Sequence, residues 1–101
     1  MLLKKFNWKK EVVESKEPVL VDFWAAWCGP CRAMNPTIES LAKDFKVAKV
    51  NVDTNQELAG HYKVSSIPAL MIFKNGRIEA QHLGITPETT LRAELEKLRE
   101  N

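Results

Sequence analysis

The residues most able to do chemistry lie in the segment Trp27-Cys28-Gly29-Pro30-Cys31, which contains both cysteines of the 101-residue chain. Two cysteines separated by two residues can form a disulfide that opens and closes, or can supply half of a four-ligand metal site. If Cys31 lies one helical turn after Cys28, their Cα atoms are about 5–6 Å apart, which suits a disulfide. So short a loop removes little entropy from the unfolded chain, so the spacing favours a redox couple over a structural crosslink.

Two alternatives to a redox couple remain open from the cysteines alone. A zinc site would need two more ligands, and the histidines available are His61 and His82. They are much farther apart than the paired histidines of common zinc sites, which disfavours this interpretation. The two cysteines could also be inert buried thiols.

The sequence around the cysteines resembles the thioredoxin family. The resemblance comprises segments 19–31, 66–70 and 73–76 and continues through Gly84. Several separate segments agree in order and spacing, so the match is more specific than a Cys-x-x-Cys spacing alone. It implies an α/β thioredoxin fold, in which a central mixed sheet of about five strands is flanked by four helices. It also implies a dithiol–disulfide oxidoreductase that reduces disulfides in target proteins.

The two cysteines are expected to have different roles. Cys28 would enter the following helix first, where the positive end of the helix dipole stabilises a thiolate, so Cys28 is the expected nucleophile. It would attack a target disulfide, and Cys31, set deeper, would then attack the mixed disulfide and release the reduced target. The resemblance to the family implies the same two roles.

The neighbours of the cysteines are expected to contact the target protein. The bulk of Trp27 would leave one side of the Cys28 sulfur open, and Gly29 has no side chain to obstruct docking. Pro30 carries neither a charge nor an N–H donor, and the absence of a histidine between the cysteines favours a reducing couple. The structural alternative for these two residues is an ordinary Gly-Pro turn.

Asp22 is an acid within the apolar run 19–24. Burial without a partner would be costly or would raise its pKa. The functional interpretation is a proton acceptor for Cys31, acting through water, which matches the buried aspartate of the family. An exposed acid at a strand edge is the alternative. Lys49 aligns with a lysine that neighbours this aspartate in thioredoxins and could support proton transfer, or it could be a solvated strand residue.

Pro68 is expected to form the second half of the site. The resemblance implies that the Ile67-Pro68 bond is cis and that a target peptide pairs with the Ile67 backbone as an added strand. Trp24, Ile67 and Gly84 would frame an apolar patch around Cys28, although a tryptophan at position 24 also suits a core and a glycine at position 84 also suits a turn.

The sequence departs from the family at two positions near the site. Ala69 replaces a threonine found in many thioredoxins, and Asn35 replaces a small apolar residue before Pro36. We expect such departures to tune target choice or stability, because neither removes a catalytic group.

Composition narrows the possible partners. The chain is 45% hydrophobic with a net charge of +2, which predicts one domain spanning 1–101 and neither nucleic acid nor a membrane as a partner. The absence of a signal-peptide pattern and of other cysteines predicts the cytoplasm. The expected partners of this monomer are thioredoxin reductase and disulfide-containing proteins, with no bound cofactor. A binding module that does not use its cysteines is the alternative from another class, and an oxidase or isomerase is the alternative among enzymes.

Hydrophobic patterns predict strands that alternate with helices, followed by a hairpin. Strands are expected over 2–6, 19–24, 47–53, 69–73 and 77–83. Helices are expected over 8–15, 31–45 and 54–62, and from Pro87 to about Leu98. This order predicts a mixed sheet with helices on both faces, with 19–24 as a central parallel strand.

Local signals predict where these elements begin, bend and end. They are Asn7 as a helix cap, Pro36 as a kink, a capping box over 54–57, the hairpin turn Asn75-Gly76, and Thr86 as an N-cap before Pro87.

Overall fold

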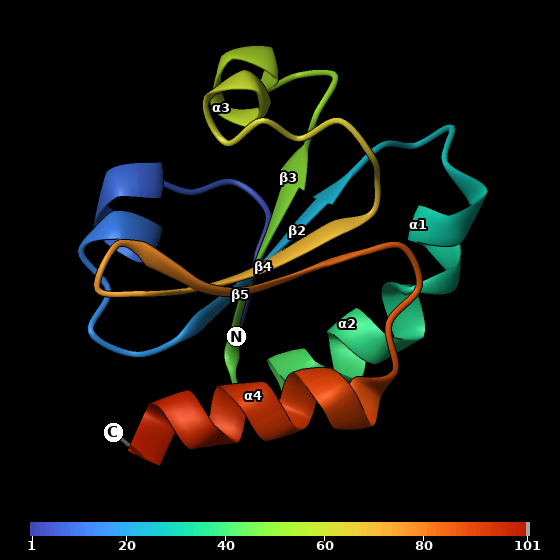
Figure 1. The fold of residues 1–101 in the computed structure, drawn as a ribbon. Helices are drawn as coiled ribbons and strands as arrows, with labels where there is room; N and C mark the ends of the chain where they lie inside the picture. Colours follow the sequence, from blue (N-terminus) through green and yellow to red (C-terminus); the bar gives the residue numbers. More distant parts are fainter. Residues whose placement is uncertain (101) are drawn as a thin grey trace.

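A five-stranded mixed sheet with the strand order β1-β3-β2-β4-β5 forms the centre of the structure (Figure 1). The computed structural model describes residues 1–100. The strands are β1 (Leu2–Leu3), β2 (Val19–Trp24), β3 (Lys46–Asn51), β4 (Ala69–Lys74) and β5 (Arg77–Leu83). β3 is parallel to β1 and β2, whereas β4 is antiparallel to β2 and β5. The predicted mixed sheet is confirmed, and β2 is its central strand.

Helices cover both faces of this sheet (Figure 1). They are a short π-helix (Lys9–Val13), α1 (Gly29–Ala33), α2 (Asn35–Ala42), α3 (Gln56–His61) and α4 (Glu88–Glu100). α2 and α4 pack against one face, and the π-helix and α3 against the other. No helix within residues 1–100 combines the length and the apolar character needed to cross a membrane.

The continuous apolar run of β2 follows from this arrangement. Leu20 packs with the side chains of α2 and α4, whereas Val21 and Phe23 pack in the cluster on the opposite face. Because successive strand residues point to opposite faces, Asp22 lies on the same face as Leu20. The sheet therefore directs an acidic side chain toward the layer that contains α1 and α2.

The predicted helix over 31–45 is two helices. α1 ends at Ala33 and α2 begins at Asn35, with Met34 between them. Pro36 has no N–H with which to continue the helical hydrogen bonds, so the expected kink is a complete break. The first helix also begins earlier than predicted, at Gly29, because the Cys28 side chain accepts a hydrogen bond from the backbone N–H of Cys31 and caps it.

Several predicted boundaries are wrong by a few residues. β1 ends at Leu3 instead of residue 6, because the chain then leaves the sheet so that Phe6 joins the core on the π-helix side. β3 ends at Asn51, where the side-chain oxygen accepts a hydrogen bond from the Asp53 N–H and starts a turn. The helix predicted over 8–15 is the shorter π-helix Lys9–Val13. Asn7 Oδ1 does accept a hydrogen bond from the Lys10 N–H, as expected of a cap.

Neither of the two threonines predicted as an N-cap directly precedes its helix. The Thr54 hydroxyl lies 3.4 Å from the Asn51 carbonyl oxygen, to which it donates, and α3 begins after Asn55 without a side-chain cap. The Thr86 hydroxyl donates to the Gly84 carbonyl, and α4 begins at Glu88. In both cases the threonine hydroxyl donates to a carbonyl two or three residues earlier in the chain.

The C-terminal half contains the elements that the sequence predicted most closely. Asn75 and Gly76 both have positive φ, as the tight turn between β4 and β5 requires. Leu91 and Leu95 are buried, and Leu98 packs against the same cluster. The hairpin and the apolar stripe of the last helix are therefore confirmed.

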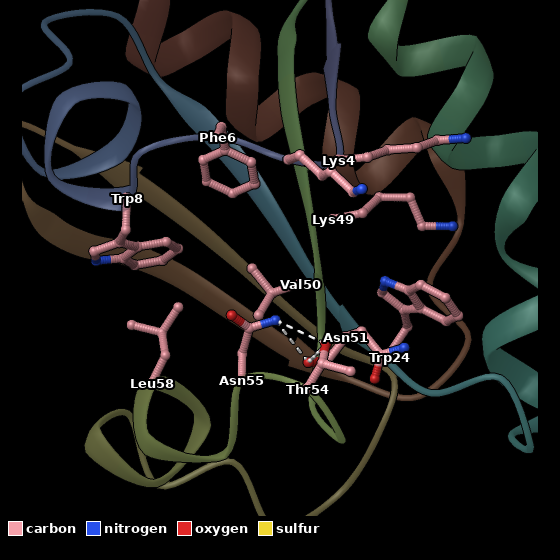
Figure 2. Close-up of a pocket in the computed structure, with 11 residues that line it drawn as sticks. Lys4, Phe6, Trp8, Trp24, Lys49, Val50, Asn51, Thr54, Asn55 and Leu58 are labelled. Carbon is pink, nitrogen blue, oxygen red and sulfur yellow. Dashed lines mark hydrogen bonds between the residues drawn. The ribbon is translucent and has the colours of Figure 1, made fainter.

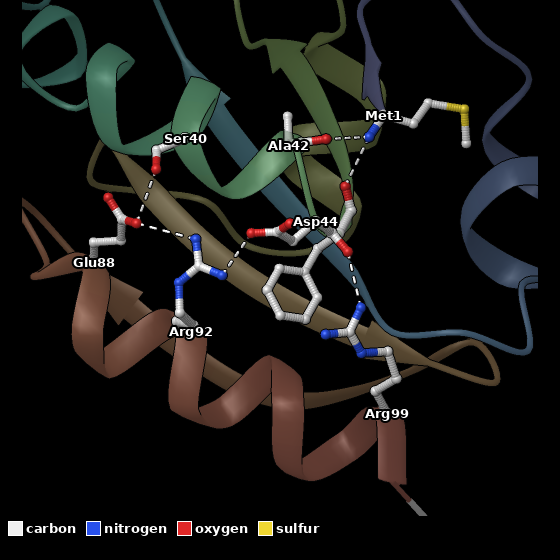
Figure 3. A network of polar contacts seen from close by, with 8 residues as sticks. Met1, Ser40, Ala42, Asp44, Glu88, Arg92 and Arg99 are labelled. Carbon is white, nitrogen blue, oxygen red and sulfur yellow. Dashed lines mark hydrogen bonds and ion pairs between the residues drawn. The ribbon is translucent and has the colours of Figure 1, made fainter.

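Polar contacts fasten α4 and the chain start to the segment after α2 (Figure 3). The Arg92 guanidinium donates to Asp44 at 2.8 Å and to Glu88 at 3.1 Å. Arg99 donates to the Asp44 carbonyl, and the Met1 ammonium donates to the carbonyl of Ala42. These contacts connect α4 and the start of the chain to the carboxyl end of α2.

Candidate active site

The two cysteines form a disulfide at the amino end of α1. Their Cα atoms are 5.3 Å apart, within the range expected from one helical turn. Cys28 is the N-cap, and its Sγ lies 3.1 Å from the backbone nitrogen of Cys31. The helix therefore directs a backbone N–H at the sulfur of the first cysteine.

The surface around the disulfide is apolar and open. Cys28 is 5% exposed and Cys31 is 2% exposed, so the expected difference in depth is present but small. The Trp27 side chain is 69% exposed, and its Nε1–H donates to Asp53 at 2.9 Å. The two residues between the cysteines are exposed as well.

The loop that contains Pro68 lies beside Cys28. The Ile67-Pro68 bond is cis, as predicted. The Sγ of Cys28 lies 3.9 Å from the Ile67 carbonyl oxygen, and the Gly84 N–H donates to the Pro68 carbonyl at 2.8 Å. Three segments that are distant in the sequence therefore meet at the disulfide.

Leu83 and Ile85, which flank Gly84, were not among the predicted site residues. They are 63% and 64% exposed, respectively, although leucine and isoleucine usually avoid such exposure. A possible signal in the sequence was an apolar residue on each side of a glycine that ends an edge strand. Their neighbour Gly84 is hydrogen-bonded to Pro68, so both belong to the segment that joins the Pro68 loop.

Asp22 is fully buried in the central strand, so the alternative of an exposed acid at a strand edge is wrong. Neither of its carboxylate oxygens has a hydrogen-bond partner within the described residues. Burial raises the pKa of Asp22 to about 6, and the positive charge of Lys49 opposes part of this increase. The carboxyl therefore titrates close to neutral pH.

Lys49 is the residue of β3 that pairs with Asp22 in the strand register. Its ammonium donates a hydrogen bond to Asn35 Oδ1 at 2.8 Å and lies 4.7 Å from the centroid of the Trp24 ring. The lysine is half-buried and has specific partners, so it is not a freely solvated strand residue.

Lys49 also lines a pocket of about 590 Å³ (Figure 2). Its wall combines three lysines with three aromatic side chains, together with residues of β3 and the loop before α3. The six are Lys4, Lys5, Phe6, Trp8, Trp24 and Lys49. Neither cysteine lines it, although Trp24, which does, also packs against the cluster that contains both cysteines.

The histidines that a zinc site would require have other contacts. His82 forms a 2.8 Å contact with Glu94, and the His61 ring packs edge-on against Tyr62. Within residues 1–100, no three or more His, Cys, Asp or Glu side chains come together in a way that could hold a metal ion.

A closable disulfide at the amino end of a helix, with Trp27 and the Pro68 loop beside it, is the arrangement of a dithiol–disulfide oxidoreductase. The family model for thioredoxin matches residues 1–97. The chain belongs to the thioredoxin family, and its Cys28–Cys31 pair is a redox-active disulfide that serves to reduce disulfides in proteins.

Individual relatives agree with this assignment. The chain is 49% identical over 95 residues to thioredoxin 1 of Nostoc sp., which covers 90% of this chain and 89% of that protein. It is 44% identical over 95 residues to the chloroplastic thioredoxin M5 of rice, covering 90% of this chain and 55% of that protein. A solved mutant thioredoxin from Halobacterium salinarum superimposes with a TM-score of 0.88 at 35% identity, covering 99% of this chain and 92% of that one. The thioredoxin fold expected from the sequence is confirmed.

Proposed function

We propose that Cys28 is the nucleophile and Cys31 the resolving cysteine when this protein reduces a target disulfide. The observation that carries the proposal is the position of the Cys28 sulfur at the start of α1, 3.1 Å from the Cys31 backbone nitrogen. In the reduced protein this N–H and the helix dipole favour a thiolate at Cys28. Cys31 is 2% exposed against 5% for Cys28, and in this scheme it reacts second.

The reaction transfers two electrons from the cysteine pair to the target. The Cys28 thiolate attacks one sulfur of the target disulfide, which forms a mixed disulfide and releases the other target sulfur as a thiolate. Cys31 then loses its proton and attacks Cys28 Sγ. The Cys28–Cys31 disulfide forms, and the second target thiolate leaves.

We assign the proton of Cys31 to Asp22, with water as the relay. Asp22 lies on the face of the sheet that α1 and α2 cover, and its pKa of about 6 suits a base that works near neutral pH. Lys49 supports this role because its positive charge limits the increase in the pKa of Asp22 that burial causes.

The target is proposed to dock across the open surface around Cys28. Its extended backbone pairs with the backbone of Ile67 in the Pro68 loop, which gives affinity without sequence specificity. The remaining contacts come from exposed residues on the three segments that meet at the disulfide. These are Trp27, Gly29, Pro30, Gly84 and the added pair Leu83 and Ile85.

A thioredoxin reductase is the proposed source of electrons for the oxidised pair. The support for this partner is family membership, together with a disulfide that contains both cysteines of the chain. We place this single-domain monomer in the cytoplasm, because a protein without structural disulfides suits a reducing compartment.

The assignment of the two cysteines is tested by trapping. Cys31→Ser should accumulate a covalent mixed disulfide with a model disulfide protein, because nothing resolves the bond to Cys28. Cys28→Ser is the matched control and should form none. Adducts detected by mass spectrometry on Cys31 in the Cys28→Ser protein, at the rate seen for Cys31→Ser, would reverse the assignment.

A further inference from the structure

The Lys49 side chain has a partner that the catalytic scheme does not use. Asp22 and Lys49 are register neighbours on β2 and β3, yet the Asp22 oxygens accept no hydrogen bond in the described residues. The ammonium of Lys49 is instead bonded to Asn35 Oδ1 at 2.8 Å. It also lies against the face of Trp24.

Asn35 is held where this contact can form. It is the first residue of α2, and the break before Pro36 fixes its position relative to α1. Asparagine often caps a helix, but the N-cap of α2 is Met34 and no side chain caps this helix. The side-chain hydrogen bond of Asn35 therefore joins two elements of the fold and has no local role within its own helix.

We propose that Asn35 is a positioning residue: its side-chain oxygen holds the Lys49 ammonium away from the Asp22 carboxylate, so that Asp22 remains a strong enough base to take the Cys31 proton. The inference rests on the proposed role of Asp22. It concerns the position of one charge relative to one carboxyl, which can be measured separately from catalysis.

The positive charge of Lys49 lowers the pKa of the buried Asp22 carboxyl and opposes the effect of burial. On the same face, β4 contributes Leu70, α2 contributes the neutral Asn35, and α1 contributes the Cys31 thiol of the reduced protein. A flexible lysine released from Asn35 is attracted to the buried, unpartnered carboxylate, because opposite charges attract most strongly where water is excluded.

The test is a titration of the Asp22 carboxyl by carbon-13 NMR in the reduced protein. In Asn35→Ala the ammonium moves toward Asp22, and the pKa of Asp22 should fall by about one unit. In Asn35→Asp the new carboxylate holds and neutralises Lys49, and the pKa of Asp22 should rise. The new carboxylate also repels the Asp22 carboxylate directly, so the decrease in Asn35→Ala is the diagnostic result, and a purely structural role of Asn35 would not produce it.

Lys49→Met supplies the matched control. In this background Asn35→Ala should leave the pKa of Asp22 unchanged, because the charge that Asn35 positions is gone. The inference is overturned if Asn35→Ala raises the pKa, as it would if the ammonium turned into the pocket of Figure 2, or leaves it unchanged. An equal decrease with and without Lys49 also overturns it.

The pH profile of the resolving step separates this inference from the proposed role of Asp22. Rapid mixing of the reduced protein with a target disulfide gives the rate of that step. Its acid limb should move with the measured pKa of Asp22, downward in Asn35→Ala and upward in Asn35→Asp. If the pKa moves as expected while the limb stays in place, Asn35 still positions Lys49, and Asp22 is not the proton acceptor.

Discussion

The substitution Asp22→Asn would show how much the ionisation of a buried carboxyl destabilises this fold. Asp22 is fully buried, and its oxygens have no hydrogen-bond partner in the described part of the chain. Asparagine has nearly the same size and is neutral at every pH. The variant therefore resembles the protonated form of the wild-type protein and lacks only its charged form.

The expected magnitude follows from the pKa of Asp22. Burial raises it from the ordinary value of 3.8 to about 6, so the folded protein binds this proton more tightly than the unfolded chain does. The free energy of unfolding of the wild-type protein therefore decreases as pH rises from 3.8 through about 6, and this loss is complete above that range. One pKa unit corresponds to about 1.4 kcal/mol, which gives a total of about 3 kcal/mol.

Urea unfolding of the oxidised proteins at about pH 3.5 and about pH 8 measures this effect. The free energy of unfolding of Asp22→Asn should increase relative to wild type by about 3 kcal/mol between the lower and the higher pH. Because both proteins share every other carboxyl, subtracting one from the other at each pH cancels the titration of those groups.

Glu79→Gln is a suitable control, because Glu79 is an exposed carboxyl on β5. Its stability difference from wild type should change by less than about 0.5 kcal/mol between the two pH values. A difference for Asp22→Asn that is the same at both pH values would refute the reasoning. It would mean that Asp22 ionises as readily in the folded protein as in the unfolded chain.

Two further predictions concern stability and are measured by the same unfolding experiment. The free energy of unfolding should fall by about 1–2 kcal/mol in both Gly76→Ala and Gly84→Ala, because both glycines have positive φ. The decrease should be larger for Gly76→Ala, because a Cβ there would lie 3.0 Å from the Val13 carbonyl oxygen, whereas a Cβ at Gly84 has no neighbour within 4 Å. Equal decreases in the two variants would contradict this explanation. The free energy of unfolding of Glu11→Ala should be lower by about 1–3 kcal/mol, because the substitution removes the carboxylate that lies 3.0 Å from the nearly buried ammonium of Lys46. An unchanged free energy of unfolding would contradict this.

Much of the fold follows from short stretches of sequence. Three local patterns predicted the elements that the structure contains: the apolar run of β2, the Asn75-Gly76 turn and the leucine stripe of α4. The predictions that failed concern helix and strand ends, where short polar side chains such as Thr54 have several possible backbone partners nearby. The sequence does not say which partner is used, because that choice depends on where the turn places the hydroxyl group.

The functional site, like the fold, could be predicted only in part from the sequence. The spacing of Cys28 and Cys31 by itself determined that the chain has a closable disulfide, because one helical turn sets the distance between the two residues. The sequence also marked Asp22 as unusual and Asn35 as a departure from the family, but it assigned Asn35 no partner.

Tertiary structure alone decided how the groups around the disulfide interact. The order of the elements already predicted that β2 is central and that helices cover both faces, but that the buried Asp22 oxygens have no hydrogen-bond partner in the described residues follows only from how distant segments pack. The contacts of Lys49 with Asn35 and of Cys28 with Ile67 join separate elements of the chain. Hydrophobic periodicity is a local property that predicts the elements, whereas burial and the contacts between elements depend on how distant segments pack, and these set the pKa of Asp22.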